Sequence, residues 1–208
     1  MTRFYPLLAG AGLLTASLAT LAGCASSPPV HYHTLSAAVV EGGASEPAPF
    51  AFELLPVGIP AQLDQERVVV RENATGVVIR DSERWTGPFG DEVRNALGVQ
   101  LAASLQAQDV SGLGKPAGRK VMRIQVQVRR FDAWLGDKVQ VEATWRLGFA
   151  DADPQARLVC SSRLEAPARG GYPELVQAQQ RVLGQLAASI AAGARAWDRT
   201  SGACPGQQ

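Results

Sequence analysis

The sequence predicts an α/β fold, a two-layer sandwich in which a largely antiparallel sheet carries two amphipathic helices on one face. Residues 121–131 and 139–149 alternate apolar and polar side chains, as strands do when one face is buried and the other is wet. Residues 86–108 and 173–198 repeat apolar residues at helical spacing. Of the 208 residues, roughly 185 remain after an N-terminal leader, enough for one domain with a substantial core.

Short strands are predicted in the first half of the chain, because β-branched, aromatic and alternating apolar residues gather there. They are residues 30–35, 50–57, 67–71 and 77–80. The last two form a hairpin around the turn residues 73–76. Residues 41–49, rich in Gly, Ala and Pro, predict a loop, and residues 59–64 predict a turn or a short helical linker.

The first helix is predicted to follow this hairpin, with Thr86 as its cap and Pro88 in its first turn. Asp91 and Glu92 suit the positive end of the helix dipole. The apolar residues at helical spacing form the stripe that we expect to be buried. They are Phe89, Val93, Ala96, Leu97, Leu101 and Leu105.

A three-stranded meander and a second helix complete the domain. The strands are residues 121–131, 139–149 and 157–165, with turns at Gly136-Asp137 and Asp153-Pro154. The second helix, residues 173–198, is expected to bury Leu175, Val182, Leu186, Ile190 and Trp197, with Ala187 and Ala194 allowing close approach. Both helices need an apolar partner, and the dry face of the meander supplies one.

The N-terminus has the features of a lipoprotein signal. A positive residue, Arg3, precedes an apolar run over residues 7–21, and Leu21-Ala22-Gly23-Cys24 then reads as a lipobox. An ordinary signal peptide with an incidental cysteine is the alternative. We expect residues 1–23 to be a signal peptide, Cys24 to carry lipid, residues 24–29 to be a short tether, and residues 30–204 to form one periplasmic domain. Ala25 follows the cysteine, whereas Asp there is associated with retention at the inner membrane, so the outer membrane is favoured.

Two cysteines remain after lipidation of Cys24, namely Cys160 and Cys204. An even pair in an oxidising compartment predicts a disulfide, and two free thiols are the alternative. The bridge would close a loop of roughly 45 residues, worth about 4 kcal/mol in the chain-entropy model.

The sequence offers little catalytic chemistry, so we expect a non-enzymatic protein without cofactor or metal. It has no P-loop, nucleophile elbow or HExxH motif. His31 and His33 share a strand face and could in principle share a metal, but polar residues on a strand are the simpler interpretation. A net charge of +1 speaks against nucleic-acid binding. Arginines 123, 129, 130 and 146 could line a basic strip for an acidic partner or a lipid headgroup, although cross-strand pairing with Glu142 is the simpler interpretation.

Two places are candidates for a partner interface. Ile59, Pro60 and Leu63 lie in an apolar linker between strands, and Arg84 and Trp85 stand at the entrance of the first helix. For Trp85 the alternative is a hydrophobic staple that covers the end of the helix.

Four features in order resemble one known family. They are the segment Tyr32-His33-Thr34-Leu35 soon after the lipobox, the segment Val57-Gly58-Ile59-Pro60-Ala61-Gln62-Leu63-Asp64, the strand 67–71 followed by Arg84-Trp85, and a helix with Asn95, Leu97, Leu101 and Leu105. Gln62 and Gly87-Pro88-Phe89 depart from the usual pattern. In these features the chain resembles the ABC-type transport auxiliary lipoprotein family over nearly all of its mature length.

The resemblance implies an outer-membrane lipoprotein that works with an ABC transporter and a mammalian-cell-entry (MCE) domain protein in moving lipids between membranes. It also implies a docking role and a homo-oligomeric ring. Two alternatives come from other classes, a structural or secretion-assembly lipoprotein of the pilotin type and a small periplasmic hydrolase. The lack of a histidine-anchored or paired-carboxylate site speaks against the hydrolase.

Overall fold

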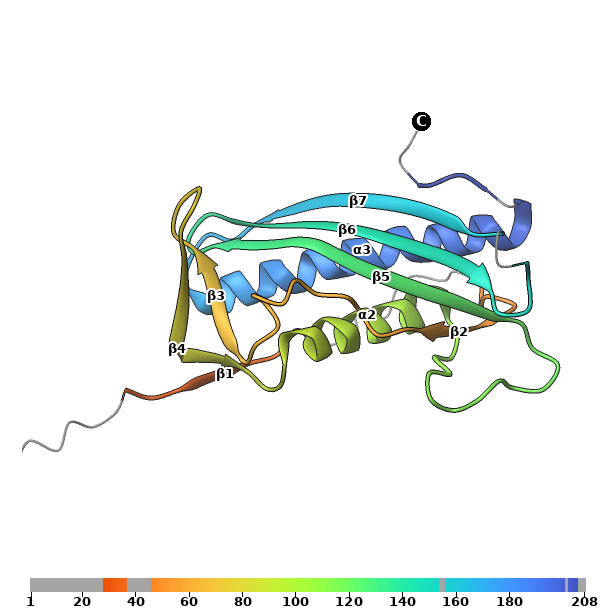
Figure 1. Ribbon diagram of the computed structural model, residues 1–208, viewed down its shortest axis with the longest axis horizontal. Helices are drawn as coiled ribbons and strands as arrows, with labels where there is room; N and C mark the ends of the chain where they lie inside the picture. Colours follow the sequence, from red (N-terminus) through yellow and green to blue (C-terminus); the bar gives the residue numbers. More distant parts are fainter. Residues whose placement is uncertain (1–27, 37–45, 154–155, 201, 206–208) are drawn as a thin grey trace, which may run out of the picture.

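The computed structural model describes residues 28–36, 46–153, 156–200 and 202–205. Seven strands and two helices follow one another along these residues (Figure 1). The strands are β1 (His31–His33), β2 (Ala51–Leu54), β3 (Arg67–Arg71), β4 (Val77–Trp85), β5 (Val121–Trp134), β6 (Lys138–Phe149) and β7 (Leu158–Pro167), and the helices are α2 (Phe89–Leu105) and α3 (Tyr172–Thr200).

All seven strands belong to one sheet, ordered β1-β4-β3-β5-β6-β7, with β2 paired separately to β5. The meander β5–β6–β7 and the hairpin β3–β4 are antiparallel, as the sequence predicts. The pairs β1–β4, β2–β5 and β3–β5 are parallel, so the sheet is mixed. These parallel pairs join segments that lie far apart in the sequence, which local patterns do not reveal.

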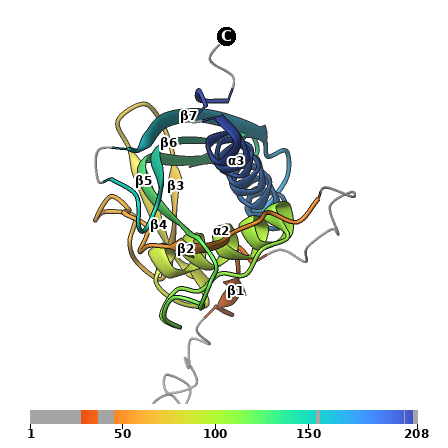
Figure 2. The same ribbon diagram turned by 90° about the vertical axis from the view of Figure 1, so that its right-hand side faces the viewer.

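Both helices pack on the same side of the sheet, which curves around α3 (Figure 2). The predicted stripe of α2 is buried from Phe89 to Leu105. On α3, Leu175, Val182, Leu186 and Ile190 are buried as predicted, while Trp197 is partly buried against the core. The predicted two-layer α/β sandwich is therefore confirmed.

A bulge in β5 keeps apolar side chains facing the core along the whole length of the strand. The register between β5 and β6 shifts between Val128 and Arg130. Without that extra residue the alternation that buries Val128 would expose Phe131, whereas Phe131 and Ala133 are both buried. The strand thereby extends to Trp134, three residues past its predicted end.

Other predicted boundaries differ for physical reasons. The strand predicted over residues 50–57 ends at Leu54. Gly58 nevertheless continues along β5, since its N–H donates to the carbonyl of Val126 at 3.0 Å and its carbonyl accepts from Val128 at 2.9 Å. The strand predicted over residues 30–35 is limited to β1, and β4 is longer than the predicted residues 77–80.

Thr86 does not cap α2, contrary to the sequence prediction. The N-cap residue is Pro88, which has no capping hydroxyl, and the Thr86 hydroxyl donates to Glu92 instead. The Asp64 carboxylate, from the preceding loop, accepts from Gly90 N at 2.9 Å and so satisfies one of the free amides of the first turn.

The predicted signal peptide and the lipidated Cys24 lie outside the described residues. Within the described ranges, neither helix combines the length and apolar character that a membrane crossing requires.

Candidate partner interface

The loop between β2 and β3 holds three of the predicted interface residues against the start of α2. A turn at its centre is closed by Leu63 N, which donates to the Pro60 carbonyl at 2.8 Å. Ile59 approaches the first turn of α2, because a Cβ at Gly90 would lie 3.5 Å from Ile59 Cγ1. Ile59, Pro60 and Leu63 are all half-buried. These contacts hold the loop in place, and its three half-buried side chains, Ile59, Pro60 and Leu63, form an apolar ridge beside α2.

Trp85 lies inside the domain and not on its surface. Its side chain is 3% exposed, and its ring centroid lies 5.4 Å from that of Phe89 and 6.3 Å from that of His33. Its backbone N–H donates to the Glu66 carbonyl at 2.7 Å. This placement is that of the alternative interpretation, in which the indole covers the entrance of the helix. In this conformation its ring is not available to a partner.

A small cavity lies between Leu63 and this aromatic cluster, bounded also by Phe89 and Phe131. Its volume of about 10 Å³ is room for about one water molecule. Gln179 of α3 lines the same cavity, is 2% exposed, and has a carbonyl oxygen without a hydrogen-bond partner among the described residues. A water molecule in a cavity of that size would donate a hydrogen bond to the Gln179 side-chain oxygen.

Arg84 lies on the opposite face of β4 from Trp85, because side chains alternate along a strand. The parallel pairing of β1 with β4 places Tyr32 beside Arg84. Tyr32 is 65% exposed. Its aromatic ring and the Arg84 guanidinium therefore lie side by side on the surface, next to the end of the tether. The sequence prediction missed Tyr32 as a surface residue, although its alternation with His31 and His33 indicates it.

The tip of the hairpin adds further apolar surface that sequence reasoning missed. Val77 and Ile79 of β4 are exposed large apolar residues, and Ile79 pairs with Val69. Figure 1 shows this hairpin at the same end of the long axis as β1. Apolar side chains therefore concentrate at the end of the domain from which the tether leaves.

Glu83 of β4 connects the two histidines of β1. Its carboxylate accepts a hydrogen bond from His31 Nδ1 at 3.1 Å and from His33 Nε2 at 2.6 Å. The carboxylate is almost completely buried, at 9% exposure of its side chain. The sequence alone could not predict Glu83 as a partner of the histidines, because 50 positions separate it from His33. The histidines hold β1 in place through it.

Tyr172, the first residue of α3, has a phenol whose pKa departs clearly from its ordinary value. Burial raises the pKa of the phenol. The positive charge of Arg80 and a hydrogen bond from its side chain lower it, and the negative charge of Glu83 raises it. The Tyr172 ring also lies 6.5 Å from the His33 ring, so this residue shares the environment that holds β1.

Glu92 joins the segment after β1 to the first turn of α2. It is buried, and one carboxylate oxygen accepts from Thr34 Oγ1 and from Leu35 N, both at 2.8 Å. The other oxygen accepts from Thr86 Oγ1. Besides its predicted interaction with the helix dipole, the Glu92 side chain therefore connects β1 and β4 to α2 through hydrogen bonds to the residues that follow these strands.

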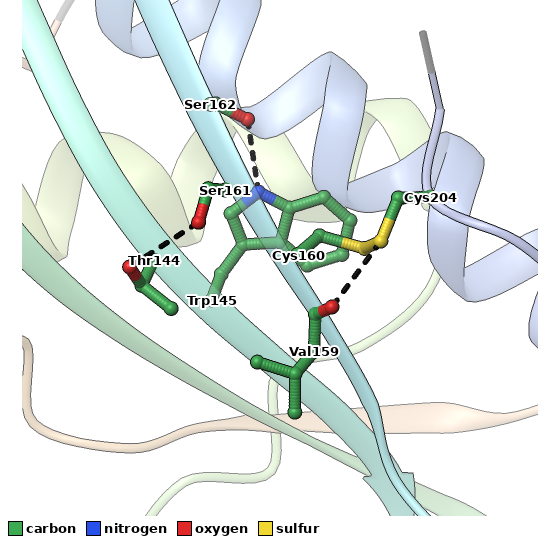
Figure 3. Close-up of a disulfide and its surroundings, with 7 residues drawn as sticks. All are labelled: Thr144, Trp145, Val159, Cys160, Ser161, Ser162 and Cys204. Atoms are coloured by element: carbon green, nitrogen blue, oxygen red, sulfur yellow. Dashed lines mark hydrogen bonds between the residues drawn. A yellow bond between two sulfur atoms is a disulfide. The ribbon is translucent and has the colours of Figure 1, made fainter. Parts of the chain in front are cut away.

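The structure joins Cys160 and Cys204 in a disulfide, with a Cα–Cα distance of 5.6 Å (Figure 3). Cys160 lies on β7 beside the buried Trp145, whose Nε1–H donates to Ser162 Oγ at 3.0 Å. The bridge fastens the segment after α3 to an edge strand of the sheet.

Two of the four arginines of the predicted basic strip are neutralised by carboxylates. Arg123 pairs with Glu53 at 2.8 Å, and Arg130 pairs with Asp132 and lies 3.9 Å from Glu142. The contact with Glu142 is the cross-strand pairing that the sequence predicts for Arg130. Arg129 and Arg146 have no carboxylate partner in the part of the chain that the structure describes.

The described residues include no group of three or more His, Cys, Asp or Glu side chains placed to hold a metal ion. Glu83 with its two histidines forms hydrogen bonds that fasten a strand. The exposed side chains at this end of the domain include Tyr32, Val77 and Ile79, and Arg84 lies beside Tyr32.

Comparison with known proteins relates the chain to transport lipoproteins. The family model described as ABC-type transport auxiliary lipoprotein component matches residues 33–191. The intermembrane transport lipoproteins PqiC of Escherichia coli (strain K12) and of Shigella flexneri are each 30% identical over 184 residues, which cover 86% of this chain and 94% of the relative.

Two solved structures share the fold. A crystal structure of an uncharacterized protein has a TM-score of 0.61 at 19% identity and covers 79% of this chain and 97% of its own. A crystal structure of a Xanthomonas campestris protein has a TM-score of 0.62 at 13% identity and covers 78% of this chain and 94% of its own. At these identities the structures support the fold alone.

Proposed function

Because this chain belongs to the ABC-type transport auxiliary lipoprotein family, we propose that it is an accessory subunit of an ABC system that moves lipids between membranes through an MCE-domain protein. Family membership makes it an auxiliary lipoprotein of a transport system. The observation that carries the proposal is the 30% identity to intermembrane transport lipoproteins over 86% of the chain. The proposal includes no catalytic step and no cofactor.

We place the protein at the periplasmic face of the outer membrane, anchored by lipid on Cys24. The domain begins at β1, whose first residue, His31, comes seven positions after Cys24. Such a tether reaches roughly 25 Å at full extension. Detachment of β1 from the sheet would lengthen the tether. The hydrogen bonds from His31 and His33 to Glu83 hold β1 in place and oppose this. These features support a domain that stays close to its membrane.

Docking is assigned to the tether end of the domain. The exposed side chains there are Tyr32, Val77 and Ile79, with Arg84 beside Tyr32. The half-buried ridge of Ile59, Pro60 and Leu63 borders the start of α2. Exposed apolar side chains together with an aromatic residue and an arginine match the composition of protein interfaces. We propose that this surface contacts the MCE-domain partner or a second copy of the chain in a ring.

Co-purification tests the proposal. The tagged lipoprotein is extracted from membranes in mild detergent, its partners are identified by mass spectrometry, and its oligomer mass is measured by light scattering. We expect an MCE-domain protein with its ABC transporter and a homo-oligomer. Recovery of secretin components without an MCE-domain protein would favour the secretion-assembly alternative.

A surface variant locates the contact. The double substitution Tyr32→Ser and Ile79→Ser should reduce partner recovery or oligomer mass. Val159→Ser, which removes an exposed apolar side chain from β7, is the matched control and should change neither. Unchanged partner recovery and oligomer mass in the double variant would remove the tether end as the docking surface.

A further inference from the structure

A hollow of about 160 Å³ lies on the solvated face of the sheet, where β5 and β6 meet the start of β7. One water molecule needs only about 10–15 Å³ of such space, so the hollow has room for a larger group. Half of its lining residues are arginines and none is acidic. The lining residues are Leu55, Arg123, Gln125, Arg146, Leu147 and Arg157.

A glycine near the C-terminal end of β6 lets one of these arginines lie across the strand. Gly148 pairs with Arg123 of β5, and it shares the solvated face with Arg146 because side chains alternate. Its φ is not positive, so the backbone does not require a glycine here. A Cβ at this position would lie 2.5 Å from Cδ and 2.6 Å from Nη1 of Arg157. The missing side chain is therefore what allows Arg157 to approach the strand.

The three guanidinium groups retain unused donors. Arg123 uses Nε on Glu53, Arg146 uses Nη2 on the Gln125 amide oxygen, and Arg157 uses Nη1 on nearby backbone carbonyls. Each guanidinium has five N–H donors. Among the described residues the other nitrogens have no hydrogen-bond partner, and only Arg123 has a carboxylate partner.

Two other cations on this face of the sheet are neutralised, whereas Arg129, outside the hollow, has no carboxylate partner among the described residues. Arg163 pairs with Glu142 at 3.0 Å, and Lys138 pairs with Glu165 at 3.0 Å. The hollow over Gly148 therefore brings together two arginines without a carboxylate partner in the described part of the chain, Arg146 and Arg157, beside the paired Arg123. Cations without a partner that share a hollow repel one another unless an anion lies between them.

We propose that this hollow binds a phosphate-type oxyanion, either a soluble phosphate or the phosphate of a phospholipid headgroup. Arg123, Arg146 and Arg157 supply the donors. A planar guanidinium matches two phosphate oxygens at once, which makes arginine the preferred residue for such groups. Figure 1 shows that β5 begins at the end of the long axis far from β1, so the site lies away from the tether. The inference depends only on the hollow and is independent of the proposed transport role.

Calorimetric titration tests the site, with inorganic phosphate added to the full-length lipoprotein in a non-ionic detergent at low ionic strength. We expect saturable binding that Arg146→Gln weakens about tenfold, as the loss of a charge-assisted contact predicts. Gly148→Ala should also weaken it, since the added Cβ displaces Arg157. Arg129→Gln removes the same charge from the same face outside this hollow and should change the affinity by less than about twofold.

Two further probes identify the source of the phosphate. Monomeric dihexanoyl phosphatidylglycerol carries the group on a lipid, and dihexanoylglycerol lacks it. Binding of inorganic phosphate and of the phospholipid supports recognition of the group itself, and binding of one alone identifies its source. No saturable binding of either at about 10 mM, tenfold above a weak Kd of about 1 mM, would overturn the proposal. Equal losses in Arg146→Gln and Arg129→Gln, or equal binding of dihexanoylglycerol, would overturn it too.

Discussion

The indole ring of Trp145 on β6 lies directly against the backbone of Gly193 on α3. A Cβ at position 193 would lie 2.8 Å from Cη2 and 3.1 Å from Cζ3 of the ring. The ring is fully buried and is held by its hydrogen bond to Ser162, so it has little room to move. The close approach of α3 to the meander therefore depends on the absence of a side chain at this position.

Gly193→Ala should destabilise the domain. Overpacking a rigid core site costs about 1–3 kcal/mol, and the better helix propensity of alanine offsets about 1 kcal/mol of that. We expect a net loss of up to about 2 kcal/mol in the free energy of unfolding, measured in guanidinium. Gly184→Ala on the same helix is the control, because a Cβ there meets nothing within 4 Å. It should stabilise the domain by up to about 1 kcal/mol. If both variants shift stability in the same direction, Trp145 does not limit the packing of α3.

Loss of the disulfide should weaken the domain more strongly. The bridge spans 44 positions of sequence, and the chain-entropy model assigns a loop of that length about 4 kcal/mol. Cys204→Ser should therefore lower the thermal midpoint by about 8–16 °C and make it insensitive to reductant. Thiol titration of the unfolded, unreduced wild type gives an independent reading. Two reactive thiols in that titration would show that Cys160 and Cys204 are not joined.

Glu92→Ala should be among the most damaging polar substitutions in the domain. It leaves the Leu35 amide and two hydroxyl groups without their acceptor, and the Leu35 hydrogen bond is buried. Unsatisfied buried donors cost about 1–3 kcal/mol each, so we expect a loss of about 3 kcal/mol in unfolding free energy. Asp91→Ala, an exposed neighbour in the same helical turn, should cost about 0.5 kcal/mol through the helix dipole alone. Equal costs in the two variants would contradict the connecting role of Glu92.

Several parts of this structure could be predicted from sequence because their signals are local. The meander and both helices follow from alternation and helical spacing, and the hairpin follows from its turn residues. The contacts of Glu83, Asp64 and Glu92 could not be predicted, since each reaches a partner that only the parallel pairing of β1 or the path of the β2–β3 loop brings near. Trp85 shows the same limit, because whether an aromatic covers a helix end or faces a partner depends on what packs over it.

Stability should fall at alkaline pH through Tyr172. Because burial raises the pKa of this phenol in the folded state, its contribution to stability is complete below the unfolded value of about 10. That contribution is lost as the pH rises through the folded pKa. Tyr172→Phe should therefore reduce the decline of the urea midpoint above about pH 10.

Neighbouring charges give opposite shifts that can be followed by phenolate absorbance. Arg80→Gln removes the positive charge that opposes burial and should raise the pKa of Tyr172 further. Glu83→Gln removes a negative charge and should lower it. Shifts in the same direction would show that these side chains do not act on Tyr172 through their charges.

The length of the tether should affect function if the domain must dock its partner while it stays close to the membrane. The direct change is a 20-residue Gly/Ser insertion after Ser27, which adds about 25 Å of root-mean-square reach to the short segment before β1. We expect a loss of protection in an assay of the outer-membrane barrier against detergent, with normal protein level and lipidation. A two-residue insertion at the same place should keep function, because it changes the reach by only about 7 Å. Full protection with the long insertion would show that close apposition to the membrane is not required.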